Sequence, residues 1–139
     1  MRTGDPVKQK GAAAVEMAFA TLLLIWLVLG VVDVGRAIIT DIGLKEAVQA
    51  GAHHFAFTET ATGADAETVA VASTETPTLA AGDITATCFP VTRNGQNYGT
   101  VTVSATHDLE LITPIVGAAL GGTIELSEIA EAERYFPCP

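Results

Sequence analysis

The first residue that could do chemistry in this chain is a carboxylate at the start of an apolar segment. Glu16 follows Gly11-Ala12-Ala13-Ala14-Val15, and the run from Met17 to Val32 has no charged residue. A carboxylate in a membrane-spanning segment is costly, and residues of this kind are usually functional and paired. The simpler alternative is that the Glu16 side chain only reaches out to the membrane interface.

The apolar segment is long enough to cross a membrane. Residues 12–32 are apolar apart from Glu16 and Thr21, and a helix of this length spans ~31 Å, about one hydrocarbon core. Three of the seven basic residues precede it, namely Arg2, Lys8 and Lys10. This positive flank predicts a cytoplasmic N-terminus, with everything beyond Asp33 in the periplasm or at the cell surface.

A cleaved secretory signal peptide is the main rival to a membrane span. Its apolar region should run only ~7 to 15 residues and end at a small-x-small cleavage site. Here the run is longer and leads into Val32-Asp33-Val34. The sequence therefore predicts a single-pass protein of the inner (cytoplasmic) membrane, with the lipid bilayer as a partner.

The Gly11-to-Glu16 spacing resembles the processing site of type IV pilin-like precursors. In that family a prepilin peptidase cuts after the glycine and leaves the glutamate fifth in the mature chain. The resemblance implies cleavage between Gly11 and Ala12, and a pair between Glu16 and the new α-amino group of a neighbouring subunit. A buried charge without its partner costs ~3 to 5 kcal/mol, so such a pair would set the axial register of the subunits.

A longer match narrows the family. The stretch from Lys10 to Ala18, the leucine-rich run and the segment Gly30-Val31-Val32-Asp33-Val34-Gly35-Arg36 resemble the N-terminal signature of TadE-like proteins. The resemblance implies a minor pilin or pseudopilin of the tight-adherence (Flp-type) type IV pilus system, serving adhesion or secretion. Its partners would be the prepilin peptidase, other pilin-like subunits and the Tad assembly machinery in the inner membrane.

The chain departs from the family pattern in two places. Thr21 stands where many relatives have a proline, which puts a kink of the membrane helix in doubt, and residues 49–54 lack the Arg-Glu-Gly-Ala-Arg run that relatives often have. Met17 replaces the tyrosine usual in the major Flp pilin, so a minor component fits better. The alternative is an uncleaved single-pass protein whose outer domain binds an envelope component.

Charge and composition exclude several classes of function. Beyond Gly11 the chain has four basic residues against 15 acidic ones, which argues against binding nucleic acid or anionic lipid headgroups through the outer domain. No Gly-x-Ser-x-Gly motif or phosphate-binding loop is present, and the three histidines have no nucleophile nearby. We therefore expect neither an enzyme nor a cofactor.

Cys88 and Cys138 are the only cysteines. An even count in an exported domain favours a disulfide, which would close a loop of ~50 residues and stabilise the fold by ~4 kcal/mol in the chain-entropy model. The alternatives are two free thiols or a metal site with His53, His54 or His107. Close Cys-x-x-Cys or His-x-x-x-His spacing is lacking, so no metal is expected.

The pattern of apolar residues predicts an α+β, pilin-like fold. Residues 1–11 form a cytoplasmic leader, 12–33 the transmembrane helix and 34–57 an amphipathic extension, so that one helix of ~69 Å runs from Ala12 to about Phe57. Its apolar residues recur near the helical period, at Val34, Ile38, Ile42, Leu44, Val48 and Phe55. Residues 58–83 form a connection with a short helix from Asp65, as its cap, to about Ser73.

The sequence predicts that residues 84–139 form a small antiparallel sheet of about three strands, which packs on the helix. Asn94-Gly95 suits a two-residue type I′ turn, which sets Arg93 opposite Gln96. One face then collects Ile84, Ala86, Cys88, Val101, Val103 and Ala105. Pro90 falls opposite Gly99 with its missing N–H outward, so 84–92 should be an edge strand.

The sequence predicts one more helix and one more strand between Thr113 and Glu128. Thr113 should cap a short helix in which Pro114 takes the first position, residues 115–120 follow and Gly121-Gly122 end it. A third strand should run from Thr123 to Glu128. The glutamates at 125, 128, 131 and 133 should form a solvated face, or else dock another subunit.

Overall fold

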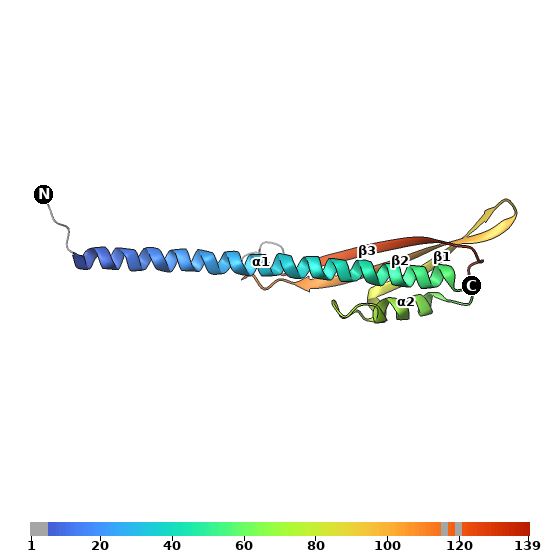
Figure 1. Ribbon diagram of the computed structural model, residues 1–139, viewed down its shortest axis with the longest axis horizontal. Coiled ribbons are helices and arrows are strands. Elements are labelled where there is room, and N and C mark those ends of the chain that lie inside the picture. The colour runs from blue at the N-terminus through green and yellow to red at the C-terminus, as the bar shows by residue number, and fades with distance from the viewer. Residues whose placement is uncertain (1–5, 115–116, 119–120) are drawn as a thin grey trace.

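A computed structural model describes residues 6–114, 117–118 and 121–139. The elements are α1 (Pro6–Phe57), α2 (Gly63–Ala72), a 3-10 turn η1 (Ala81–Asp83), β1 (Ile84–Arg93), β2 (Gln96–Glu110) and β3 (Thr123–Arg134). The long helix α1 extends far beyond the rest of the molecule at its N-terminal end, and the sheet and α2 lie along its C-terminal half (Figure 1). The predicted α+β, pilin-like arrangement is confirmed.

The helix α1 is one continuous element of 52 residues. Its part from Gly11 to Phe57 is long and apolar enough to cross a membrane once. At Thr21 the hydroxyl donates a hydrogen bond to the carbonyl of Met17, 2.8 Å away, and the helix passes through this position unbroken. Thr21 keeps its backbone N–H, which a proline at this position would lack, so the helix needs no kink here.

The three strands form one antiparallel sheet in the order β1-β2-β3. The register predicted for the hairpin is confirmed, since Arg93 pairs with Gln96, Cys88 with Val101 and Pro90 with Gly99. Asn94 and Gly95 both have positive φ angles, 53° and 77°, as a type I′ turn requires. β1 is an edge strand, also as predicted. β3 continues to Arg134, six residues beyond the predicted end.

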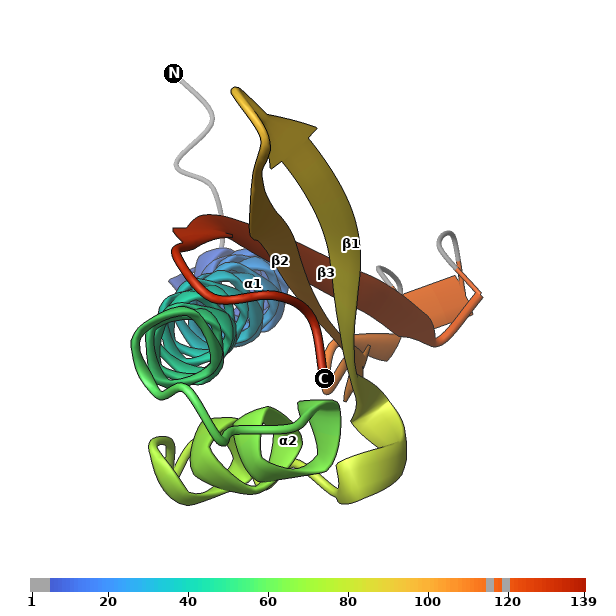
Figure 2. The ribbon, with the colours of Figure 1, turned by 90° about the vertical axis from the view of Figure 1, so that its right-hand side faces the viewer.

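The core lies between one face of the sheet and the two helices. Both helices lie on the same side of the sheet (Figure 2). α1 contributes Leu44, Ala47, Val48, Ala52 and Phe55, α2 contributes Ala66 and Ala70, and the sheet contributes Ile84, Val101, Val103 and Ala105. Burying this apolar surface drives the C-terminal half of α1 onto the sheet.

The predicted apolar face of the helix extension is wrong in its first half. Leu44, Val48 and Phe55 are buried (0, 2 and 2% exposed). In contrast, Val34, Ile38 and Ile42 lie outside the core and are 60, 55 and 50% exposed. This part of the helix therefore has two apolar stripes, one exposed and one buried. The residue spacing alone predicted a single stripe.

Glycines mark the face of α1 that packs inward. A Cβ at Gly43 would lie 1.9 Å from the carbonyl oxygen of Thr76, and one at Gly51 would lie 2.9 Å from that of Ala66. Neither distance is possible for a real side chain, so only glycine lets the connection and α2 approach this closely. The packing face follows these small residues rather than the larger exposed ones.

The cap of α2 differs from the predicted one. Thr62 is the N-cap, and Asp65 occupies the third helical position and completes a capping box. The Asp65 carboxylate accepts the Thr62 backbone N–H at 2.8 Å and the Thr62 hydroxyl at 2.8 Å. These bonds, led by the backbone one, lower the pKa of Asp65 below its usual value.

The segment predicted as a short helix after Thr113 is described only in part. Pro114, Gly117 and Ala118 are helical, and the rest of the predicted helix, residues 115, 116, 119 and 120, lies outside the described residues. Gly121 and Gly122 both have positive φ angles, 88° and 89°, which glycine adopts without strain.

Candidate functional site

The predicted processing and assembly residues lie on a part of α1 that contacts nothing else in the described chain. Gly11, Ala12 and Glu16 are exposed, and a Cβ added at Gly11 would meet no atom within 4 Å. Ala12 and Glu16 are four residues apart, so they lie on the same side of the helix, one turn from each other. The side chains next to Glu16 form an open apolar surface of Ala14, Met17, Ala18, Thr21, Leu22 and Ile25.

Asp33 joins the apolar part of α1 to the segment that follows β2. Its carboxylate accepts the backbone N–H groups of Ile112 (2.9 Å) and Thr113 (2.8 Å), and the residue is only 4% exposed. The Arg36 guanidinium lies 3.7 Å from the same carboxylate and donates to the carbonyl of Glu110 at 3.0 Å. The end of β2 is therefore held at the point where the outer domain meets the apolar helix. Sequence reasoning treated Asp33 as the end of the membrane span and as part of the family signature, and did not predict these bonds.

Arg134 is the second structural anchor, and sequence reasoning missed it. It is 1% exposed, and its guanidinium donates to the backbone carbonyls of Phe55, Glu59, Ala61 and Pro137. A cation at the C-terminal end of a helix is favoured by the helix dipole. The group also lies 5.2 Å from the ring centre of Phe55, within cation–π range. The end of β3 is thus joined to the end of α1.

The predicted disulfide is present. Cys88 and Cys138 are bonded, with their Cα atoms 5.7 Å apart, which removes free thiols and a cysteine metal site from consideration. In the described part of the chain, no three His, Cys, Asp or Glu side chains gather as metal ligands. The disulfide packs on Gly99, where a Cβ would lie 2.7 Å from the Cys88 sulfur. It ties the C-terminus to β1 next to Arg134.

The glutamates of β3 do not all face solvent. Glu125, Glu131 and Glu133 are exposed, but Glu128 lies on the helix-facing side and is 3.5 Å from Lys45 Nζ. Lys45 also lies 2.6 Å from Asp41. Lys45 donates a hydrogen bond to the Asp41 carboxylate, and this bond lowers the pKa of Asp41 and raises the pKa of Lys45. The prediction of one solvated acidic face is therefore wrong for Glu128.

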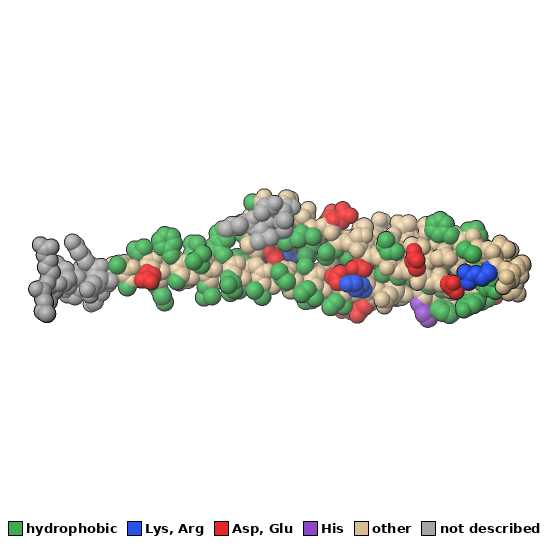
Figure 3. All heavy atoms as spheres, turned by 90° about the horizontal axis from the view of Figure 1, so that it is seen from above, with side chains coloured by type: hydrophobic (Ala, Val, Ile, Leu, Met, Phe, Trp, Pro, Cys, Tyr) green, Lys and Arg blue, Asp and Glu red, His purple; other side chains and the backbone are tan. Residues whose placement is uncertain are grey.

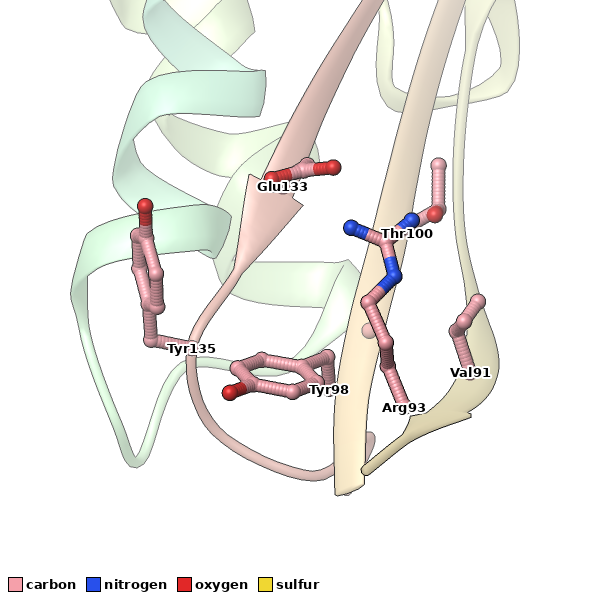
Figure 4. A pocket seen from close by; sticks show the side chains of 7 residues that line it. Val91, Arg93, Tyr98, Thr100, Glu133 and Tyr135 are labelled. Atoms are coloured by element: carbon pink, nitrogen blue, oxygen red, sulfur yellow. The ribbon is translucent and has the colours of Figure 1, made fainter. Parts of the chain in front are cut away.

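A cleft lies on the outer face of the sheet, at the end farthest from the N-terminus of α1. It has a volume of about 280 Å³ and is lined by Val91, Arg93, Tyr98, Gly99, Thr100, Glu133 and Tyr135. The two tyrosine rings meet edge to face, with centres 6.2 Å apart. The Arg93 side chain points up between Glu133 and Thr100 (Figure 4). We call this site the distal cleft.

One comparison with known proteins found a match, and it lies in the N-terminal segment. Residues 11–53 match the family model described as TadE-like protein, which confirms the resemblance over that part of α1. No curated protein and no solved structure matches the chain. The match ends before α2 and the sheet, so it says nothing about these elements.

Proposed function

We propose that this chain, whose α1 helix carries the TadE-like segment, is a minor pilin or pseudopilin of a Tad (Flp-type) pilus system. A prepilin peptidase cleaves it between Gly11 and Ala12, and the mature subunit takes part in pilus assembly for adhesion or secretion. The observation that carries the proposal is the N-terminal half of α1, which is apolar, exposed and bears Glu16. Such a surface can be covered first by lipid and then by other subunits.

Cleavage supplies a cation for Glu16. Among the side chains that the structure describes, which begin at Gly11, no basic one lies within ion-pairing distance of Glu16. Afterwards each subunit has an α-amino group at Ala12, and a charge pair in an apolar helix bundle is strong because the surroundings screen it weakly. The pair forms in only one relative position of two subunits, so it selects the axial register.

The amino group could also reach Glu16 of its own chain, because the two residues are one turn apart on one helix. This internal pair would stabilise the helix start without joining subunits. The two arrangements differ in their effect on assembly: only the pair between subunits makes pilus formation depend on the Glu16 charge.

The test is replacement of Glu16 in a host that assembles the pilus. Glu16→Gln keeps the shape of the side chain and removes its charge, whereas Glu16→Asp keeps the charge on a shorter side chain. We expect cleavage to persist in both, and incorporation into pili to fall by roughly 100-fold in Glu16→Gln, as the loss of ~3 kcal/mol implies. Glu16→Asp should retain part of the wild-type incorporation into pili. Unimpaired incorporation of Glu16→Gln would remove the pairing role.

The distal cleft favours a second function, binding of an envelope component by the outer domain. Arg36, Lys45 and Arg134 all have partners, whereas Arg93 has no carboxylate within ion-pairing distance among the described residues. The cleft thus offers guanidinium donors, a Glu133 carboxylate acceptor and two aromatic rings. We infer that it takes a neutral, hydroxyl-rich ligand such as one envelope sugar ring, because an anion would meet Glu133 and an acidic domain.

Saturation-transfer NMR with neutral methyl pyranosides tests this second function. The full chain is held in a detergent without a sugar headgroup, so that the detergent does not compete. Transfer to the sugar should disappear in Tyr135→Ala and persist in the control Ile129→Ala, which changes an exposed residue on the same face of the sheet. Absence of transfer for every pyranoside, or equal transfer in both variants, would exclude this function.

A further inference from the structure

The apolar surface of α1 does not end where the uncharged run ends. Beyond Asp33, Val34, Ile38, Ile39 and Ile42 all have at least half of their surface exposed. These residues lie outside the core that packs on the sheet. On the face shown in Figure 3, hydrophobic side chains line α1 up to the start of the outer domain. An exposed apolar patch that continues a membrane-facing surface indicates contact with the membrane.

Asp33 does not mark the water boundary. Both of its carboxylate oxygens accept backbone N–H groups from residues 112 and 113, and Arg36 lies beside it. A carboxylate with its hydrogen bonds met inside the protein and a cation next to it can lie at membrane depth, whereas an unpaired one cannot. The Arg36 side chain is long enough to keep its charged end towards the interface.

The apolar surface also continues onto the outer domain. A groove of about 550 Å³ runs along the junction and is lined by Leu27, Gly30, Val31, Asp33, Val34, Ala37, Leu111 and Ile124. Among the described residues that line it, Asp33 alone is charged, and its carboxylate accepts backbone N–H groups. Next to this groove, Ile112 is 51% exposed. Residues of the membrane helix and of the sheet therefore form one apolar surface.

The length of this surface matches a membrane. The 28 residues from Val15 to Ile42 span ~42 Å along a helix, compared with ~30 Å for the hydrocarbon core and ~40 to 45 Å for core and interfaces together. We infer that the acyl chains of the outer leaflet cover α1 as far as Ile39, that Ile42 and the paired Asp41 and Lys45 lie at the polar interface, that acyl chains fill the junction groove and that Ile112 enters the lipid. The outer domain thus sits in the membrane surface, and its water-exposed part begins near Lys45. This inference requires neither cleavage nor pilus assembly.

Tryptophan fluorescence tests this placement because the chain has one tryptophan, Trp26. In a Trp26→Phe background, single tryptophans are introduced as Ile38→Trp, Ile112→Trp or, as a control, Gln49→Trp. All three sites are exposed in the structure, so the substitutions leave the core intact. The full chain is reconstituted at low density in phosphatidylethanolamine–phosphatidylglycerol vesicles, with or without lipids brominated near the glycerol end of the acyl chains.

We expect the brominated lipid to quench Ile38→Trp and Ile112→Trp several-fold more than Gln49→Trp, and aqueous acrylamide to show the reverse order. If acrylamide quenches the first two as strongly as Gln49→Trp, the inference is wrong. It is also wrong if they are shielded from both quenchers, because a second copy of the chain then covers this surface. Since no peptidase or pilus machinery is present, neither result bears on the proposed pilin function.

Discussion

The two halves of α1 have similar backbone geometry and opposite surroundings. Residues 11–32 carry large apolar side chains that are largely exposed, whereas the half that packs on the sheet is buried through Leu44, Ala47, Val48, Ala52 and Phe55. The buried half includes Gly43 and Gly51, where backbone from other elements approaches closely. The comparison teaches that side-chain size along this helix separates two kinds of contact. Next to the glycines, the backbone of other elements packs on the helix and large side chains such as Leu44 and Phe55 are buried; where that packing is absent, large side chains are exposed.

Removing the disulfide should have the largest effect, and it should affect only the half of α1 that packs on the sheet. Cys88→Ser with Cys138→Ser frees a loop closed over a sequence separation of 50 residues, and we expect the outer domain to lose about 4 kcal/mol. The N-terminal half of α1 should stay helical in lipid, because its bonds are internal to the helix. Denaturant unfolding followed by circular dichroism checks this. If the oxidised wild type and the double-serine variant have the same free energy of unfolding, the disulfide contributes nothing to stability.

Replacing Arg134 should have the next largest effect. Arg134→Leu leaves buried carbonyls of the α1 end and the following loop without donors, and hydrogen bonds to a charged group contribute about 1.5 to 3 kcal/mol each. We expect a loss of at least about 3 kcal/mol in the free energy of unfolding. Arg93→Leu, an exposed arginine of the same sheet, is the control and should stay within ~0.5 kcal/mol. Similar losses in the two variants would contradict the anchoring role.

Two glycines of α1 allow a matched test of the packing face. Gly43→Ala places a Cβ against the backbone of Thr76 and should cost about 1 to 3 kcal/mol through overpacking. A Cβ added by Gly35→Ala would meet no atom within 4 Å. This substitution should therefore be neutral or stabilise the protein by up to ~1 kcal/mol, because alanine favours the helix over glycine by that amount. Both are read from thermal unfolding in detergent. A stabilising Gly43→Ala would show that the connection does not pack there.

The smallest effect concerns the ion pair of Asp41 and Lys45, which lies where the exposed stripe of α1 ends. The lowered pKa of Asp41 means that its contribution to stability is present above the unfolded value of ~3.9 and is lost as the pH falls through the folded value. The raised pKa of Lys45 means that its contribution is present below ~10.4 and is lost as the pH rises through the folded value. The stability difference between wild type and Lys45→Met should therefore be largest between those limits. A difference that is constant from pH 3 to pH 8 would exclude the pair.

The hairpin was predictable because its signals are local and agree with one another. Asn94-Gly95 specifies the turn, alternation of side chains specifies the face, and one shift in register would place Val101 and Val103 in water. The predicted pairing is therefore found residue by residue. The disulfide followed from the cysteine count, and the family resemblance from the segment between Lys10 and Arg36.

The rest of the arrangement depends on contacts between distant residues. Nothing near Arg134 in the sequence indicates the carbonyls of Phe55 or Glu59, which lie 79 and 75 residues away. Asp33 likewise bonds to residues 79 and 80 positions later. The apolar period could not separate the stripe that packs inward from the one that continues the membrane surface, because both consist of apolar residues at helical spacing. The glycines at 43 and 51 carried that information.

The proposed pilin function depends first on removal of residues 1–11 by a prepilin peptidase. Mass spectrometry of the chain's N-terminus, after expression with an active prepilin peptidase or with a catalytically inactive one, tests this most directly. The proposal predicts a chain that begins at Ala12 only with the active enzyme, and a block of this cleavage in Gly11→Val. A chain that keeps residues 1–11 in the presence of the active peptidase would contradict it.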